Sequence, residues 1–222
     1  MKTMQKGFTL VEIAIVLVII GLLLGGILKG QEMITQAKIK NVMADFSGIS
    51  AAYHGYQDRY RRLPGDDNQA ATRWTDLTAA TDNGDGNGIV AGPYNAGGDV
   101  ESRNFWLHLR KAGFVAGSGK DQPFNALTGM LGVQTGDGAA TPAPTLLDGA
   151  GGPGFVGLIM CSANLPDKVA IAVDTQMDDG LSGKGTVRGL IQTGSNPATG
   201  TGAATATYAE TGSNVYVLCR SL

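Results

Sequence analysis

The sequence lacks the features by which most enzymes and nucleic-acid-binding proteins are recognised. Charged residues make up only 16% of the 222 residues, and the formal net charge is −2. A chain without a basic excess cannot neutralise many phosphates, so no nucleic-acid partner is predicted. The sequence contains no GxSxG, HExxH or CxxC pattern and no phosphate-binding loop, and neither His54 nor His108 has a cysteine or serine motif around it. We therefore do not expect an enzyme.

One long apolar run is present near the N-terminus. Residues 8–28 carry a single charge, Glu12, and at about 1.5 Å per residue this run is long enough to cross a hydrocarbon core of roughly 30 Å. The alternative is a cleaved secretory signal peptide, but no small-x-small cleavage site follows the run. Lys2 and Lys6 precede it and place the N-terminus in the cytoplasm. We expect a retained membrane helix and an exported remainder.

Cysteine is scarce, and both copies fall in the exported part. Cys161 and Cys219 form an even count in an oxidising compartment, which favours a disulfide. Closing a loop of that length would stabilise the fold by about 4 kcal/mol in the chain-entropy model. The alternative is two independent reduced cysteines in the core.

A helical pattern continues beyond the apolar run. Large apolar residues recur at alternating spacings of three and four until a Leu-Pro-Gly sequence at 63–65 ends the pattern: Ile39, Val42, Phe46, Ile49, Tyr53, Tyr56 and Tyr60. The spacing predicts one helix over 8–62. A coiled coil is one explanation of the stripe, and packing on the chain's own domain is the other. The three tyrosines favour packing on a sheet, because they are wider than a narrow coiled-coil seam accommodates.

Glycine is abundant, with 34 residues, about twice the usual share. Four glycines, Gly21, Gly25, Gly26 and Gly30, lie where the lipid-facing half of the helix meets the soluble half. Each lowers helix stability by about 1 kcal/mol relative to alanine, so the cluster is a candidate hinge. In a membrane helix small residues also allow close helix–helix contact, and both interpretations stay open.

The exported part has the pattern of a small α+β domain with long loops. A second helix is predicted over 101–112, with Phe105 and Leu109 on one face and Gly113 as its stop. Residues 117–154 are rich in glycine and proline and are predicted to be irregular. Four strands are predicted at 154–160, 168–173, 186–191 and 214–219. The expected fold is a long N-terminal helix packed on an antiparallel sheet of about four strands.

The start of the chain carries the most specific motif. The sequence Lys6-Gly7-Phe8-Thr9-Leu10-Val11-Glu12 resembles the processing site of type IV prepilins and type II secretion pseudopilins. The resemblance implies that a prepilin peptidase cleaves between Gly7 and Phe8 and methylates the new amino group of Phe8. It divides the chain into a leader at 1–7, a transmembrane and assembly half-helix at 8–30, a soluble half-helix at 31–63 and an exported pilin-like domain at 64–222.

Glu12 has a physical reason to belong to this motif. A carboxylate within a membrane helix is costly, by about 2.5–3.5 kcal/mol for Asp on insertion scales. Cleavage creates a positive amine at Phe8, with which the Glu12 of another subunit can pair. A misplaced subunit would leave a charge unmatched in an apolar core, so the pair would fix the register of assembly. The alternative is a Glu that reaches the membrane interface.

The resemblance implies a function, partners and a location. We expect a structural subunit of a type IV pilus-like filament, which resides in the bacterial inner membrane as a precursor and then in a periplasmic or cell-surface filament. Its partners would be other copies, related pilins and a prepilin peptidase. A type II secretion pseudopilin is the alternative in the same class, favoured by the absence of the helix-kinking proline that many type IV pilins carry. A membrane-tethered adhesin is the alternative of another class.

A loop rich in Asp, Asn and Gly is a candidate calcium site. Oxygen-bearing side chains at Asp82, Asn83, Asp85 and Asn87, followed by a glycine, suit a hard cation. The twelfth position of an EF-hand would be Tyr94 here, so Asp82, Asp99 or Glu101 would have to complete the shell. The alternative is a flexible turn without an ion. A second acidic group comprises Asp174, Asp178 and Asp179, for which an Asp-Gly tight turn is the favoured interpretation.

Overall fold

The computed structural model describes residues 7, 9–137, 154–196 and 207–222. By its internal contacts the chain divides into two compact units, Met1–Lys38 and Ile39–Leu222. The leader residues 1–6, Phe8, part of the predicted irregular segment at 117–154 and residues 197–206 lie outside the described residues.

Helix α1, Leu10–Tyr60, is the longest element, which agrees with the single helix expected over 8–62. In the first unit its large apolar side chains are exposed, among them Leu10, Ile15, Leu22 and Leu28. This part of the helix buries nothing within its own unit. Its stability in water therefore does not come from a packed core, which is where most helical stability in soluble proteins comes from.

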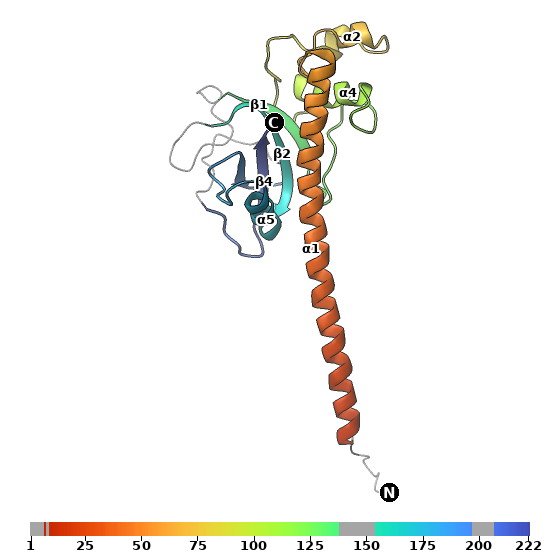
Figure 1. Cartoon of the computed structure of the whole chain (residues 1–222), viewed down its shortest axis with the longest axis vertical. Coiled ribbons are helices and arrows are strands. Elements are labelled where there is room, and N and C mark those ends of the chain that lie inside the picture. Colours follow the sequence, from red (N-terminus) through yellow and green to blue (C-terminus); the bar gives the residue numbers. More distant parts are fainter. Residues whose placement is uncertain (1–6, 8, 138–153, 197–206) are drawn as a thin grey trace. The chain divides into compact units, whose positions relative to one another are not determined.

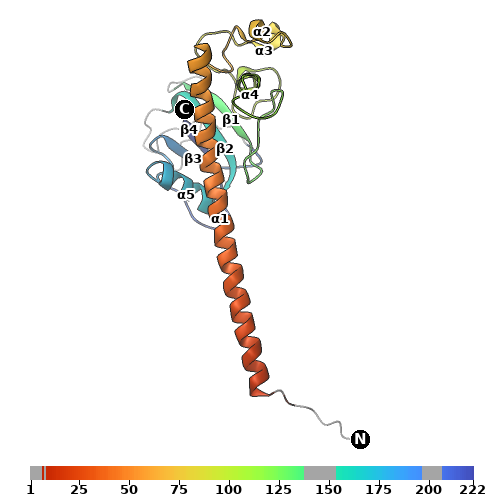
Figure 2. The same ribbon diagram turned by 45° about the vertical axis from the view of Figure 1, so that its right-hand side comes forward.

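In the second unit α1 has a buried face that packs on the sheet. Ile39, Val42, Phe46, Tyr53 and Tyr56 are buried in one core cluster with residues of the strands, and Ile49 and Tyr60 pack against that cluster. Figures 1 and 2 show this part of α1 beside β1 and β2. Of the two explanations for the stripe, packing on the chain's own domain is thus confirmed.

The sheet has four antiparallel strands in the order β1-β2-β4-β3. The strands are β1 Leu131–Asp137, β2 Val156–Pro166, β3 Val187–Ile191 and β4 Val215–Ser221. The predicted strands at 154–160, 186–191 and 214–219 correspond to β2, β3 and β4. The predicted α+β architecture, a long helix with a small antiparallel sheet, is confirmed.

Two element predictions are wrong. Residues 168–173 are not a strand but belong to helix α5, Asp167–Met177. Val169, Ala170 and Val173 are buried, which is the spacing of one helix face, and a short apolar run does not by itself distinguish a strand from a buried helix. Strand β1 lies inside the segment predicted to be irregular, where Gly132 and Gly136 gave the sequence the composition of a loop.

Those two glycines are in β1 because other backbone segments lie against it. A Cβ added at Gly132 would lie 2.0 Å from the carbonyl oxygen of Tyr94, and one at Gly136 would lie 2.4 Å from that of Phe155. Glycine within a strand commonly marks such a close backbone approach. The segment around Tyr94 is thereby held against β1.

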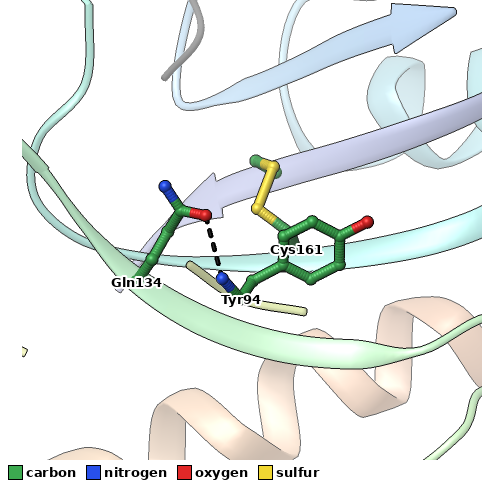
Figure 3. The surroundings of a disulfide bond; sticks show 4 residues. Tyr94, Gln134 and Cys161 are labelled. Atoms are coloured by element: carbon green, nitrogen blue, oxygen red, sulfur yellow. Dashed lines mark hydrogen bonds between the residues drawn. A yellow bond between two sulfur atoms is a disulfide. The ribbon is translucent and has the colours of Figure 1, made fainter. Parts of the chain in front are cut away.

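The two faces of the sheet have separate cores. Met160, Tyr216 and Leu218 belong to the cluster that contains α1, whereas the alternate positions belong to a second cluster that includes Tyr94. Cys161 and Cys219 lie directly opposite each other on β2 and β4 and form the predicted disulfide. Figure 3 shows the Tyr94 ring beside this disulfide, with the Tyr94 N–H donating to Gln134 Oε1 at 3.0 Å. The alternative of two reduced cysteines is excluded.

Three helices follow α1 before the sheet: α2 Ala70–Arg73, α3 Ala79–Asp82 and α4 Glu101–Lys111. Helix α4 matches the prediction over 101–112 to within one residue. Phe105 and Leu109 are buried on its inner face, and Gly113, at φ +79°, ends it as predicted. Figure 2 shows α2, α3 and α4 near the Tyr60 end of α1.

Candidate processing and assembly site

The start of α1 is organised by a reciprocal pair of hydrogen bonds between Thr9 and Glu12. The Thr9 backbone N–H and hydroxyl donate to Glu12 Oε2 at 2.8 and 2.9 Å, and the Glu12 N–H donates to Thr9 Oγ1 at 3.3 Å. Thr9 directly precedes the helix, and Glu12 is its third residue. This is a capping box, in which two of the free N–H groups of the first turn gain partners.

The capping role of Glu12 was not predicted; the sequence indicated a role in assembly, with a Glu that reaches the membrane interface as the alternative. The signal was present in the sequence, because a threonine followed three residues later by glutamate at the start of an apolar run is the usual pattern of a capping box. Glu12 is exposed, so its carboxylate can face a second molecule while it caps its own helix. Gly7 is also exposed, and no neighbour lies within 4 Å of a Cβ placed on it. Phe8 lies outside the described residues.

The helix that follows has the length and composition of a membrane span. Its most apolar window of 18 residues has a mean hydropathy of 2.8, and no residue of that window is buried in the protein. At Gly21, Gly25, Gly26 and Gly30 a Cβ would meet nothing within 4 Å. Nothing in the described residues therefore covers this surface, and the four glycines leave its outline narrow at their positions.

Comparison with known families identifies the same segment. Residues 2–28 match the model of the prokaryotic N-terminal methylation motif. The chain carries the hallmark of type IV pilins and pseudopilins. This pilin-type motif spans the leader, Glu12 and the apolar helix, and it supports processing by a prepilin peptidase and a membrane-anchored precursor. No curated protein and no solved structure matches the chain significantly.

The candidate calcium residues do not all converge in the structure. The Asp82 carboxylate accepts the Thr78 N–H at 2.7 Å and pairs with Lys120 at 2.7 Å. Asn83 Oδ1 accepts the Ala71 N–H at 2.8 Å, and its amide donates to Asn68. These two side chains thus join the loop to α2, α3 and the Lys120 segment.

Carboxylates do converge nearby, but they include Asp66, which was not predicted as part of this site. Asp66, Asp85 and Glu101 bring carboxylate oxygens within 4.8 Å of one another. Asp66 is buried and accepts the N–H groups of Gly86, Asn87 and Gly88 at 2.7–3.1 Å. No spacing in the sequence indicated that the 83–88 loop would fold around Asp66.

The remaining oxygens of this group also accept hydrogen bonds. Glu101 accepts the Asp85 and Ala91 N–H groups at 2.9 and 2.8 Å, and Asn87 donates both its backbone N–H and its amide to Asp85. The cluster organises its loop through backbone donors in this structure. Calcium binding here stays a prediction. An ion that binds only the folded state would make the melting temperature in calcium higher than that in EGTA. Equal melting temperatures would contradict the prediction.

The second acidic group forms a turn after α5. Asp174 is fully buried and accepts the Tyr208 hydroxyl at 2.5 Å and the Gly180 N–H at 3.1 Å. Asp178 and Asp179 accept the N–H groups of Val187 and Leu181 at 2.9 and 2.8 Å. Burial raises the pKa of Asp174 to about 6 against these hydrogen bonds. The three carboxylates therefore fix the connection from α5 to β3.

His108 is a structural residue of the domain. It is fully buried, its Nδ1 accepts the Gly65 N–H at 2.9 Å, and its Nε2 lies 2.7 Å from the Asp82 carbonyl oxygen. This arrangement requires the neutral ring with its proton on Nε2. Burial lowers the pKa of His108 to about 4. His54 is exposed on α1.

Proposed function

We propose that this protein is a structural subunit of a type IV pilus-like filament, made as a membrane-anchored prepilin and assembled through α1. One observation carries the proposal: a methylation motif leads directly into a fully exposed apolar helix whose first turn holds a carboxylate. An enzyme would not need this combination. A filament subunit needs each part of it.

The exposed helix explains the two environments that the proposal requires. Large apolar side chains without cover in water are unfavourable, by about 25 cal/mol per Å² of apolar surface. Lipid would cover this surface in the precursor, and the helices of other copies would cover it in the filament. The glycines at 21, 25, 26 and 30 suit both states, because small residues allow helices to approach closely.

Glu12 supplies the register of assembly in this proposal. Removal of residues 1–7 would leave a cationic amine on Phe8, at the same end of the helix as the Glu12 carboxylate. In an apolar bundle an unpaired carboxylate is strongly unfavourable, whereas a paired one is tolerated. Each incoming subunit would therefore stop where the Glu12 of one copy meets the Phe8 amine of another.

Mass spectrometry of the mature N-terminus tests the processing step. We expect a chain that begins at Phe8 and carries one added methyl group, and we expect Gly7→Ala to leave the leader attached. An intact Met1, or a cut at another position in the wild type, would remove the proposal. The matched control is Gly97→Ala, because Gly97 is also exposed and also has open space around it.

Two substitutions separate the register role of Glu12 from its capping role. Glu12→Gln keeps a capping-box partner but removes the charge, so we expect normal membrane insertion and loss of filaments. Thr9→Val removes the cap, worth about 1 kcal/mol, but keeps the charge, so we expect filaments to persist. The reverse pattern, with Glu12→Gln assembling and Thr9→Val failing, would assign Glu12 to capping alone.

The same variants distinguish the alternative functions. A pseudopilin with this motif would lose protein secretion instead of surface filaments in Glu12→Gln. A membrane-tethered adhesin would keep binding its target surface in both Gly7→Ala and Glu12→Gln, since a tether requires neither cleavage nor register.

A further inference from the structure

The second unit has an open apolar groove between α1 and the segment that follows α4. Its volume is about 310 Å³. Asp45, Gly48 and Ile49 of α1 form one wall, and Phe114 and Phe124 form much of the other. All these residues belong to Ile39–Leu222, so the groove is a feature of one compact unit.

The walls of the groove expose large apolar surface. Phe124 is 62% exposed and Phe114 is 38% exposed, although both lie beside a packed core. At Gly48 a Cβ would meet nothing within 4 Å, so the α1 wall of the groove is open at this residue. Exposed phenylalanines of this kind are enriched at protein–protein interfaces relative to the rest of a protein surface.

Asp45 is a half-buried carboxylate within this apolar surface. Among the described residues it has neither a hydrogen bond nor an ion pair, and burial raises its pKa. Burying a charge is unfavourable unless it is paired. The groove is thus complementary to an occupant that presents one cation within an apolar, narrow surface.

Another part of this chain has that chemistry. Lys29 is the one basic residue in the described part of α1 before Lys38, and its neighbours three and four positions along the helix are apolar or glycine except for Glu32. Gly25, Gly26 and Met33 share its helix face, since residues three and four apart are neighbours on a helix. Nothing lies within 4 Å of a Cβ at either glycine.

Lys29 cannot reach Asp45 of the same chain. Both residues belong to α1, and side-chain pairs within a helix form between positions three or four residues apart. Lys29 instead pairs with Glu32 at 2.8 Å, with both side chains well exposed. An exposed pair of this kind contributes at most about 1 kcal/mol, so it can exchange for a partner in a less exposed place.

We infer that the groove at Asp45, Ile49, Phe114 and Phe124 receives the Lys29 face of a second copy of this chain, with Lys29 paired to Asp45. The inference rests on the proposed function and names a second contact between subunits besides the pairing at Glu12. The ion pair selects the register, and the phenylalanines cover the apolar surface around Lys29. The glycines beside Lys29, and Gly48 in the α1 wall of the groove, let the two surfaces approach.

A charge exchange in the full-length chain tests the pairing. We expect Asp45→Lys and Lys29→Asp each to reduce the amount of filament at least tenfold, and the double variant to return it to within about twofold of wild type. Asp58→Lys and Lys40→Asp are the matched controls, because both side chains are exposed on α1 outside the groove, and we expect filaments from both. Retention of the Cys161–Cys219 disulfide shows that each variant has folded.

Cysteine cross-linking supplies the second readout. In the chain with Asp45→Cys and Lys29→Cys, oxidation of filaments should yield covalent dimers and longer ladders, whereas either single variant should yield none. The inference alone would be overturned if the wild type forms filaments, Asp45→Lys and Lys29→Asp form them equally well, and the double cysteine variant gives no ladder. The proposed function would then remain intact. A wild-type chain that is not processed and forms no filament would overturn both. Cross-links to lipid-associated or unrelated proteins in place of ladders would also overturn it.

Discussion

Two buried titratable residues of the second unit have pKa values shifted in opposite directions. Burial raises the pKa of Asp174 to about 6 and lowers that of His108 to about 4. The hydroxyl of Tyr208 and the N–H of Gly180 partly stabilise the Asp174 carboxylate. The pH ranges over which these two shifts change the stability overlap, so the two residues together determine how stability depends on pH in that range.

The signs of the two effects follow from which state binds more protons. Between about pH 4 and pH 6 the folded state holds a proton on Asp174 that the unfolded state has lost, so stability falls as pH rises. Between about pH 4 and pH 6.5 the unfolded state holds a proton on His108 that the folded state lacks, so stability rises with pH. Each effect amounts to at most about 3 kcal/mol, and in the wild type they largely cancel.

We predict that Asp174→Asn makes this cancellation visible. Without the contribution of Asp174, which falls as pH rises, the free energy of unfolding should increase by about 2 kcal/mol from pH 4 to pH 6.5. The wild-type profile should be flatter. Chemical unfolding of the full-length protein at a series of pH values checks this. His108→Gln should reverse the slope, so that stability falls over the same range. Parallel profiles for wild type and Asp174→Asn would contradict the assignment to Asp174.

At the scale of the elements, the contact between β1 and the Tyr94 segment depends on the absence of a side chain at Gly132. A Cβ at Gly132 would lie 2.0 Å from the Tyr94 carbonyl oxygen, which is backbone and cannot rotate away. We predict that Gly132→Ala lowers the free energy of unfolding by roughly 1–3 kcal/mol, the usual effect of overpacking. Urea unfolding measures it. Gly97→Ala, with open space around it, should change the stability by less than about 0.5 kcal/mol.

Gly132 also illustrates why some elements could be predicted from the sequence and others could not. Helix α1 was predictable because its apolar residues repeat at a helical spacing over many turns, and β4 was predictable because it is a short run of β-branched, aromatic and other apolar residues. Strand β1 was not, because Gly132 and Gly136 give it the composition of a loop, and their reason is a contact with residues far away in the sequence. Helix α5 was mistaken for a strand because residues 168–173 are too few for the two periods to differ.

The candidate sites also contain some features that the sequence could predict and others that it could not. The processing and membrane segment is local in sequence, so its motif and its apolar run could be found without a structure. The capping box of Thr9 and Glu12 is also local and was recognisable in principle. The role of Asp66 was not, because it depends on three backbone N–H groups about twenty residues away that only the fold brings together.

At the scale of the whole molecule, the two units have different sources of stability. Met1–Lys38 buries none of its described apolar side chains, whereas Ile39–Leu222 has two core clusters and the disulfide. The first unit therefore gains no stability from a core of its own, and in the proposed function lipid or other copies would cover it. The second unit carries its own stability, as a domain exposed to water must.

We predict that the disulfide supplies a large part of that stability. It links residues separated by 58 positions, for which the chain-entropy model gives about 4 kcal/mol, and total stabilities of domains are only about 5–15 kcal/mol. The double variant Cys161→Ala/Cys219→Ala should lose about this amount in urea unfolding, followed by the fluorescence of Trp74 and Trp106, both of which lie in the second unit.

Reduced wild-type protein is the matched control for this variant. It should unfold at nearly the same urea concentration as the double variant, because both lack the same constraint on the unfolded chain. Addition of a reductant should then leave the double variant unchanged. A variant that loses much more stability than reduced wild type would instead assign the effect to packing of the sulfur atoms beside Tyr94, and equal stability of oxidised and reduced wild type would contradict the prediction.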